Sequence, residues 1–360
     1  MSRASTTAPS RSSSPSARRD AVGLGLDVGG TKILGLAVSA SGIVLCERRR
    51  DTPAQGDELL EALADLATEL SNAVETGSGQ VAGLGVGVPG LVDIDGVLRF
   101  APNLLGANGT PVRSGLTELL GGRWPVAVDN DATCAAAGER AFGAGRGSDD
   151  VLFVTVGTGV GGGVVSGGQL LRGAHNFAGE IGHMTVDPQG PPCPCGKRGC
   201  WERYASGSGL GRLAREAADA GHASAVLALA GGDPDAIRGE HVVAAAEGGD
   251  ADAGAVLSEF AWWLGLGLAN LANVLDPGLI VLGGGLVAVL ETLLDPVRAS
   301  FAAWVERADQ RTDVRIVPAT LGERGGAAGA AVNGIEAAGY KVDNGGRGVD
   351  VGQAGPGTLD

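Results

Sequence analysis

Short apolar runs alternate with amphipathic stretches along most of the chain, which is the pattern of an α/β protein. The run VGLGLDV at 22–28 has the length of a buried strand, and a second run, ILGLAVS, follows the tip at 29–32. Two such runs joined by a short Gly-containing link predict a β-hairpin. Apolar side chains recur at helical spacing over 57–76 and predict an amphipathic helix, whereas 81–88 and 124–129 predict further buried strands.

The same plan recurs in the middle of the chain. Residues 151–168 contain an apolar run, a Gly-Thr-Gly tip at 157–159 and a second apolar run. This recurrence predicts two duplicated domains, each of which opens with a hairpin whose tip carries glycine and threonine. The stretch 157–162 also matches G-x-G-x-x-G, but its glycines lead into another strand and not into a helix, so a dinucleotide-binding turn is not indicated.

The chain beyond residue 201 is predominantly helical. The apolar stretch 252–276 is long enough for a membrane span, but its polar ends and its place in an α/β pattern favour a core helix. A strand at 278–284 follows, and the small residues of 325–339 predict a helix suited to tight packing. We expect the polar segments 1–20 and 341–360 to be disordered tails.

Composition and charge narrow the range of partners. The 360 residues are enough for two domains, and the formal net charge of −14 argues against a nucleic acid or an anionic membrane as partner. The N-terminus has no apolar segment of the kind that a secretory signal requires. Five cysteines and no signal suggest a reducing cytoplasm, in which Cys46 and Cys134 are expected to be small buried thiols.

One histidine and three cysteines lie close together in the segment EIGHMTVDPQGPPCPCGKRGCWE, which covers 180–202. Three thiolates and an imidazole form a closed tetrahedral set of the kind that structural Zn2+ prefers: His183, Cys193, Cys195 and Cys200. The metal would order a Gly/Pro-rich loop that has little apolar content of its own. The alternative is that these cysteines form disulfides or remain unligated thiols.

Acidic side chains lie at both ends of this loop and at one strand end. Glu180 and Glu202 flank the predicted metal ligands, and rigidly held carboxylates suit the hydroxyl groups of a polyol; the alternative is that both are solvated surface acids. Asn130 and Asp131 follow the strand at 124–129, where open α/β folds bind ligands. Asp131 could accept a hydroxyl proton during phosphoryl transfer, or serve only near the N-cap of the next helix.

The two hairpin tips are candidates for binding phosphate. Backbone N–H groups at such tips, with a threonine hydroxyl and the ammonium group of Lys32, suit phosphate oxygens, and Asp27 could hold Mg2+ through water. A plain Gly-rich turn is the alternative. The glycines at 283–285 follow a strand and allow close approach of a flat ring such as adenine, but a tight βα turn would look the same.

The motifs DVGGTK, VDNDATCAA, VGTGVGGGVV, EIGH and CPCGKRGCWE, in this order and spacing, resemble the ROK family of sugar kinases and repressors. The resemblance runs from about Val22 to Gly339. It implies an actin-like (ribonuclease H-like) duplicated two-domain α/β fold with an interdomain cleft. We therefore expect domains at 21–140 and 141–340, a zinc loop at 183–200 in the second, and a helix at 325–339 able to pack back on the first.

The resemblance also implies a role for each matching residue. It implies Asp131 as general base, and His183 bound to zinc through one ring nitrogen and to sugar through the other. The remaining sugar contacts would come from Asn103, Asn130, Glu180 and Glu202. The phosphates of ATP, with Mg2+, and the adenine would be held by Asp27, Gly29, Gly30, Thr31, Lys32, Gly157, Thr158, Gly159, Gly161 and Gly284. A homodimer or homotetramer is implied as well.

Within the family, the run CPCGKRGCWERYASG is similar to actinobacterial-type ATP-dependent glucokinases, which implies phosphorylation of glucose at its 6-hydroxyl. The alternatives are a kinase for another hexose or N-acetylhexosamine, such as fructose, N-acetylmannosamine or N-acetylglucosamine, and a sugar-responsive repressor. Such repressors carry an N-terminal winged helix-turn-helix, which the short segment before the first strand does not suggest. A binding protein without activity would be expected to have lost Asp131 or a tip, and polyphosphate as donor would need a basic groove.

Overall fold

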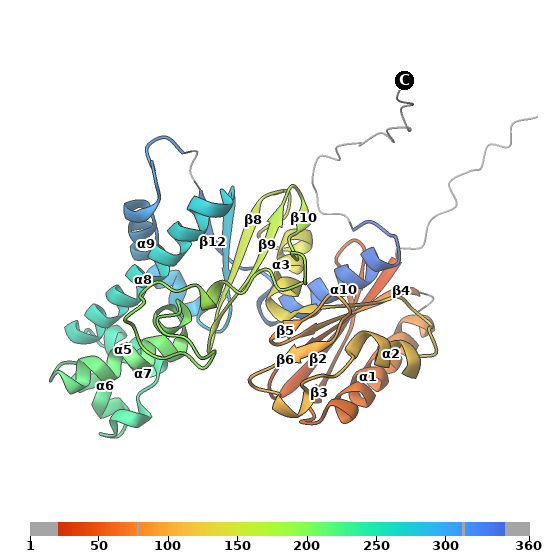
Figure 1. The fold of residues 1–360 in the computed structure, drawn as a ribbon, viewed down its shortest axis with the longest axis horizontal. Helices are drawn as coiled ribbons and strands as arrows, with labels where there is room; N and C mark the ends of the chain where they lie inside the picture. Colours follow the sequence, from red (N-terminus) through yellow and green to blue (C-terminus); the bar gives the residue numbers. More distant parts are fainter. Residues whose placement is uncertain (1–20, 78, 312–313, 343–360) are drawn as a thin grey trace, which may run out of the picture.

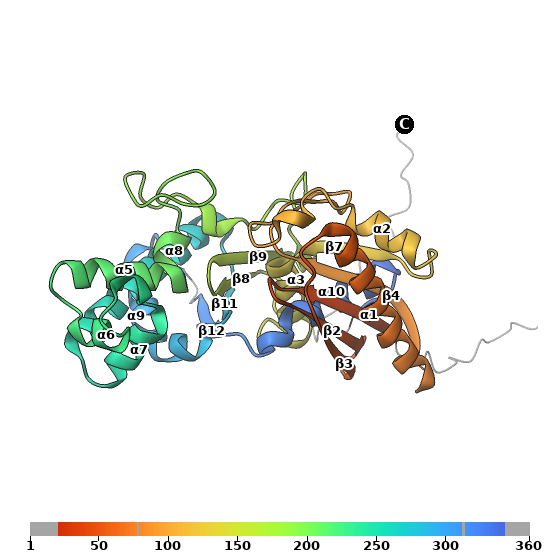
Figure 2. The same ribbon diagram turned by 90° about the horizontal axis from the view of Figure 1, so that it is seen from below.

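The computed structural model describes residues 21–77, 79–311 and 314–342, in two lobes that each contain a five-stranded sheet (Figures 1 and 2). Of the predicted disordered tails, 1–20 and 343–360 lie outside the described residues.

The first sheet has the strand order β3-β2-β1-β4-β7. Its first three strands are antiparallel neighbours, and β4 and β7 add in parallel on the other side of β1. The strands are β1 (Ala21–Val28), β2 (Lys32–Ser39), β3 (Val44–Asp51), β4 (Gln80–Val88) and β7 (Val126–Asn130). The predicted hairpin at the start of the chain is thus confirmed as β1 and β2.

Helices cover both faces of this sheet. The leucines of α1 (Gly56–Thr76), together with α2 (Val112–Leu119), pack against one face, which confirms the predicted amphipathic helix. The other face packs against α10 (Gly325–Ala337). The connection from β4 to α2 contains the short strands β5 (Leu91–Val92) and β6 (Leu98–Phe100) and the 3-10 turn η1 (Leu105–Ala107).

The second sheet repeats the plan of the first, with the order β10-β9-β8-β11-β12. Its strands are β8 (Val151–Val156), β9 (Val160–Ser166), β10 (Gln169–Leu170), β11 (Leu279–Gly283) and β12 (Arg315–Pro318). The pair β8 and β9 is an antiparallel hairpin like β1 and β2, and β11 and β12 add in parallel. The equivalent strand orders confirm the duplicated, actin-like fold.

In the second lobe, the part of the chain that runs from β10 to β12 also forms a helical layer, visible on the left of Figure 1. Its helices are α4 (Glu202–Ala205), α5 (Gly207–Asp219), α6 (Ser224–Leu229), α7 (Gly239–Glu247), α8 (Ala251–Leu275) and α9 (Val287–Trp304). Of the described helices, α8 alone is long and apolar enough to cross a membrane, but 56% of its most apolar window is buried inside the protein. Since Phe260, Leu264 and Leu268 are fully buried, α8 is a core helix, as its polar ends predicted.

The lobes meet along α3 (Asp131–Phe142) and α10. Helix α3 packs against α10 and against β8 and β9 of the second sheet, while α10 packs against β1 and β4 of the first. Contact is so close that a Cβ at Gly85 of β4 would overlap the carbonyl of Ala330, and one at Gly329 would overlap that of Cys134. Only glycine lets the backbone of α10 approach β4 at Gly85 and α3 at Gly329 this closely.

A buried carboxylate fixes the start of α10. Glu139 of α3 is 1% exposed and accepts hydrogen bonds from the backbone N–H groups of Ala144, Thr320 and Leu321. These bonds tie the connection from β12, which includes the turn η4 (Gly322–Arg324), to the helix that links the two lobes. Three charge-assisted hydrogen bonds satisfy a carboxylate that burial would otherwise destabilise.

Candidate active site

The predicted metal ligands come together in the structure. His183 lies in the short turn η2 (Ile181–His183), and isolated β-bridges hold the cysteine-containing loop that follows it. One ligand atom from each of four residues lies within 4.8 Å of the others: His183, Cys193, Cys195 and Cys200. All three cysteines are free thiols, so the disulfide alternative is not supported.

The spacing of these ligand atoms fits a tetrahedral metal. The Sγ atoms of Cys195 and Cys200 are 3.5 Å apart, and Cys193 Sγ lies 3.8 Å from His183 Nδ1. Zn–S bonds of about 2.3 Å in a tetrahedron place the sulfurs about 3.8 Å from one another. A disulfide would require about 2.05 Å. The donor set and its spacing are compatible with a structural zinc site.

The ring of His183 faces two groups at once. Its Nδ1 lies among the cysteine sulfurs, whereas its Nε2 lies 3.9 Å from Glu180 Oε2. Glu202 stands beside the same cluster, with Oε1 3.0 Å from Cys193 Sγ and 3.5 Å from His183 Nδ1. The histidine can therefore be held by a metal on one side while the other nitrogen is available to a ligand.

A cavity of about 620 Å3 opens between the two lobes and is lined by all six predicted sugar-site residues. From the first lobe it is lined by Pro89, Gly90, Leu91, Phe100, Pro102, Asn103, Asn130 and Asp131. From the second lobe it is lined by Thr155, the stretch 157–162, Gly179, Glu180, His183, Pro194, Cys195, Lys197 and Glu202. Its volume lies in the range of small-molecule binding sites.

The carboxylate of Asp131 lies at the N-terminus of α3, where the helix begins at the end of β7. Its Oδ1 accepts a hydrogen bond from the N–H of Ala132 at 2.8 Å. Burial raises the pKa of Asp131 from 3.8 to about 6, and the negative charge of Glu180 adds to the rise. A carboxylate with such a pKa is ionised at neutral pH and close to the pH range in which proton acceptance is most effective.

The N-cap of α3 is Asn130 and not Asp131. The side-chain oxygen of Asn130 accepts hydrogen bonds from the N–H groups of Ala132 at 2.9 Å and Thr133 at 3.2 Å, and its amide donates to Gly90 O at 3.1 Å. Both lone pairs of the oxygen are therefore used, and one N–H remains for a ligand. Asn130 is therefore the N-cap, although Asp131 also accepts from the N–H of Ala132 in the first turn of the helix.

Like-charged neighbours act on two further carboxylates near Asp131. Burial raises the pKa of Glu180, and Glu202 adds to this while His183 opposes it. Burial also raises the pKa of Asp27, at the end of β1, to about 7, with a further contribution from Asp131. Asp27 packs against Gly326 at the start of α10. The two carboxylates thus influence one another electrostatically, and carboxylate oxygens are ligands that a divalent cation accepts.

The two predicted phosphate tips are placed differently. The tip at 157–159 lines the main cavity and is braced by the start of α5, where Gly207 N–H donates to Gly157 O at 2.7 Å and Ser208 Oγ donates to Thr158 O at 2.5 Å. The tip at 29–32 does not line that cavity. Its Gly30 borders an adjoining cavity of about 340 Å3, which shares Pro102 and Asn103 with the first.

Two other predictions have mixed outcomes. Gly284 does not line the main cavity; its φ of +96° and its contact with the carbonyl of Val156 require glycine, as a tight βα turn would. Cys134 is fully buried as expected, but Cys46 is only partly buried because it lies on β3, the edge strand of the first sheet.

Sequence reasoning missed some residues at the site. Lys197 lines the cavity from within the metal loop, and its place between two predicted ligands was the signal that could have identified it. Arg172 pairs with Asp129, two positions before Asp131, and no local pattern connects residues so far apart in sequence.

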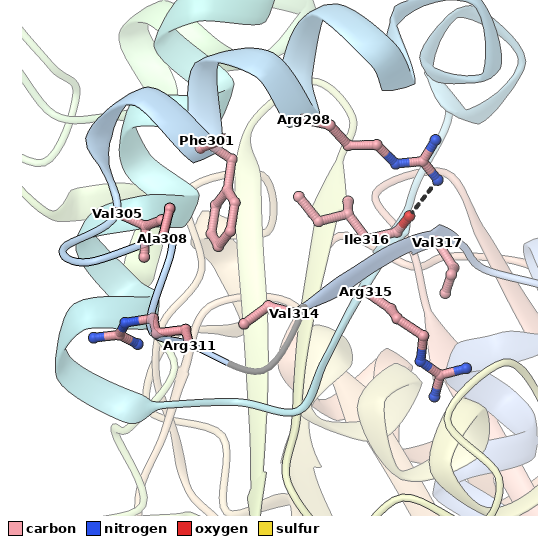
Figure 3. Close-up of a pocket in the computed structure, with 10 residues that line it drawn as sticks. Arg298, Phe301, Val305, Ala308, Arg311, Val314, Arg315, Ile316 and Val317 are labelled. Atoms are coloured by element: carbon pink, nitrogen blue, oxygen red, sulfur yellow. Dashed lines mark hydrogen bonds between the residues drawn. The ribbon is translucent and has the colours of Figure 1, made fainter.

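A second cavity, of about 550 Å3, lies between α9 and β12 and contains none of the predicted site residues (Figure 3). Two of its three arginines are engaged in the protein: Arg298 donates to Ile316 O at 2.8 Å, and Arg311 pairs with Asp276 at 3.0 Å. The lining that remains is largely apolar, from residues such as Phe301 and Val314. The predicted sugar-site residues therefore line the cavity between the lobes and not this one.

The duplicated two-lobed fold, with its cavity between the lobes, is that of an actin-like sugar kinase, and sequence comparison agrees with this class. Residues 23–334 match the ROK family, and the chain belongs to this family. It is 38% identical to a glucokinase of Streptomyces coelicolor over 86% of this chain and 96% of that protein. It is 28% identical to the xylose repressor of Bacillus subtilis over 85% of this chain and 75% of the repressor.

Comparison of structures gives the same result. The chain resembles the crystal structure of a ROK family glucokinase from Streptomyces griseus in complex with glucose and AMPPNP, with a TM-score of 0.74 and 38% identity. The match covers 88% of this chain and 99% of the Streptomyces griseus protein. The family and fold inferred from the motifs are thereby confirmed.

Proposed function

We propose that this protein is an ATP-dependent glucokinase, which transfers the γ-phosphoryl group of ATP to the 6-hydroxyl of glucose. The observation that carries the proposal is the cavity between the lobes, which brings Asp131 together with Glu180, His183 and the tip at 157–159. A base, hydroxyl-binding groups and a backbone suited to phosphate thus line a single space. The likeness to the Streptomyces glucokinases supports glucose as the sugar and ATP as the donor.

In this proposal Asp131 accepts the proton of the attacking hydroxyl. Its ionised form predominates above about pH 6. The start of α3 lies beneath it, and the capping by Asn130 keeps that turn rigid. Catalysis otherwise comes from alignment and from neutralisation of charge, as is general for phosphoryl transfer.

The sugar hydroxyls are bound by directional polar groups along the cavity wall. The proposed contacts are Asn103, the remaining N–H of Asn130, Glu180, His183 Nε2 and Glu202. Carboxylates accept hydrogen bonds from hydroxyls, whereas the asparagine amides can donate as well as accept. This mixed set of donors and acceptors distinguishes a sugar site from an anion site.

Zinc would be held by His183, Cys193, Cys195 and Cys200, and it would supply structural order and no step of the reaction. Ligation of Nδ1 fixes the His183 ring so that Nε2 keeps its direction toward the sugar. The same loop carries Glu202 and Lys197, so ordering it also places two further side chains at the cavity.

For ATP and Mg2+ we propose the two tips and the adjacent strand ends. The phosphates lie between them, bound by Gly29, Gly30, Thr31, Lys32, Gly157, Thr158, Gly159 and Gly161, with Gly284 near the adenine and Asp27 toward Mg2+. Because the first tip borders the adjoining cavity and does not line the main one, the proposal requires the lobes to close when both substrates bind. Mg2+ would neutralise phosphate charge, which Asp27 and Asp131 would otherwise repel.

The proposed function also bears on the domain organisation, location and assembly of the protein. We propose domains at 21–140 and 141–340 with α10 returning to the first, a cytoplasmic location that keeps the thiols reduced, and a homodimer or homotetramer. A kinase for another hexose or an N-acetylhexosamine would use the same residues. A repressor is less supported, since the chain matches 96% of a glucokinase and 75% of a repressor.

The test is release of ADP from Mg-ATP with a panel of hexoses and N-acetylhexosamines, with and without a zinc chelator. We expect glucose to give the highest kcat/KM and chelation to abolish turnover, with recovery on adding zinc. Preference for another sugar would leave the mechanism and replace the substrate. Absence of turnover with every sugar, in protein shown to contain zinc, would refute the kinase proposal.

A further inference from the structure

The segment 171–180 connects the second sheet to Glu180, yet it is bonded to the first lobe. It leaves β10 at the outer edge of its sheet and ends at the carboxylate that lines the cavity. Two side chains along it, those of Arg172 and Asn176, contact residues of the first lobe. The position of Glu180 therefore depends on both halves of the protein.

The stronger of these contacts is a forked ion pair whose carboxylate is buried and whose guanidinium is partly exposed. Arg172 Nε donates to Asp129 Oδ1 at 3.2 Å and to Oδ2 at 3.0 Å, and Arg172 Nη2 donates to Oδ2 at 2.9 Å. The side chain of Asp129 is 4% exposed and that of Arg172 is 40% exposed. Two parallel N–H···O contacts fix the orientation of the guanidinium as well as its distance.

A third side chain locks the pair in place. Asn333 of α10 is buried; its amide donates to Asp129 Oδ2 at 3.0 Å, and its oxygen accepts from Arg172 Nη2 at 3.4 Å. The three side chains close a triangle of hydrogen bonds contributed by β7, α10 and the segment 171–180. Such a triangle has one well-satisfied arrangement and resists small displacements.

The second contact lies further along the segment. Asn176 adopts φ of +67° and its amide donates to the carbonyl of Val92 in β5 at 3.2 Å. Between the two contacts, Ala178 N–H donates to Arg172 O at 3.1 Å and closes the segment into a compact loop. An asparagine tolerates this left-handed conformation better than most residues. The loop is thus held at both ends before it reaches Glu180.

We propose that Arg172 is a positioning residue, which sets the distance between the general base and the sugar-binding carboxylate by pairing with Asp129. Asp129 is two residues before Asp131 on β7, and Arg172 is eight residues before Glu180. One ion pair therefore joins the two chain segments that carry these carboxylates. The inference rests on the proposed kinase function, and it adds a residue that touches neither the sugar nor the nucleotide.

The test uses three variants. Arg172→Met removes the fork but keeps much of the side-chain length, and leaves Asp129 buried and unpaired. Asp129→Asn combined with Arg172→Met removes that unpaired charge. Arg172→Lys keeps a cation able to reach the carboxylate. As control, Arg311→Met removes an arginine bonded to Asp276 in the second lobe, outside the cavity between the lobes.

A positioning role and a purely structural role give different results. Positioning predicts that Arg172→Met lowers kcat for glucose roughly 30- to 100-fold, as misalignment by about 1 Å does. The double variant regains thermal stability, because no buried charge is left unpaired, but not kcat. Arg172→Lys recovers part of kcat. Arg311→Met loses stability and keeps kcat and KM.

Recovery of kcat by the double variant to within threefold of the parent would mean that the pair acts through stability alone, and would overturn the proposal. Glucose binding, measured by calorimetry without nucleotide, separates this failure from failure of the kinase function. We expect about tenfold weaker binding in Arg172→Met and in the double variant. A parent that neither binds nor phosphorylates glucose would refute the kinase function, and this inference with it. An active parent whose Arg172 variants keep the same kcat and glucose affinity would refute the inference alone.

Discussion

Replacing Asp131 with asparagine should lower the activity and raise the stability of the protein. Asparagine keeps the side-chain oxygen that accepts from Ala132 N–H but cannot accept a proton from the sugar. Loss of a general base typically lowers kcat by roughly 10^2- to 10^4-fold. Because the shape is conserved, we expect the affinity for glucose to change little.

The stability effect follows from the pKa of Asp131, which is raised from 3.8 to about 6. The folded-state pKa lies above the unfolded value, so folding favours the protonated form, and the ionised carboxylate destabilises the fold. This destabilisation is absent below about pH 4 and complete above about pH 6, where it amounts to at most about 3 kcal/mol. Asp131→Asn removes it, so the variant should be more stable than the parent at pH 7.5.

The assay combines kcat with thermal melting at pH 7.5 and at pH 4. The expected result is a variant that melts a few degrees higher than the parent at pH 7.5, with the difference gone at pH 4. A kcat within tenfold of the parent would refute the assignment of the base. A variant with a lower melting temperature at pH 7.5 would refute the electrostatic reasoning, because the ionised carboxylate would then be stabilised by the fold.

The remaining predictions concern the metal, pH and packing. Cys195→Ser should lose zinc and glucose turnover together, measured as metal content per chain and kcat, whereas Cys46→Ser on β3 should keep both; an active, metal-free variant would contradict the structural role of zinc. Because the proposed general base has a pKa of about 6, kcat/KM should fall about tenfold per unit as the pH drops below that value, and a profile flat to pH 5 would exclude it. Gly329→Ala in α10 should destabilise the protein by about 3 kcal/mol, since the methyl group would overlap the carbonyl of Cys134. Gly254→Ala in α8 meets open space and should stabilise by about 0.5–1 kcal/mol; equal melting temperatures for the two alanine variants would show that the packing argument is wrong.

Local patterns predicted the elements whose sequence determines them directly. The hairpins β1–β2 and β8–β9 follow from apolar runs around short glycine-containing tips, and the metal ligands follow from cysteine and histidine spacing within one loop. The helix α8 follows from its apolar length and polar ends. In each case the relevant residues are close in sequence, so periodicity or spacing is sufficient.

The parts that local patterns did not predict depend on contacts between distant segments. Asn130 and Asp131 are both acceptable caps, and the choice of Asn130 reflects its additional bond to Gly90. The tips at 29–32 and 157–159 look alike in sequence but border different cavities, because the relative placement of the lobes decides what each tip faces. The pair of Arg172 with Asp129 carries no local signal at all.

Helix α10 completes the first lobe, although it is made after the second lobe. Residues 325–337 are made after every strand of both sheets, yet they cover a face of β1 and β4, which come early in the chain. Until then the glycines of those strands, such as Gly85, have no helix backbone to pack against. The first lobe therefore cannot finish folding until the second lobe has been made, and a nascent chain that stops before Gly325 would be a substrate for chaperones or proteases even though every residue of its first sheet is present.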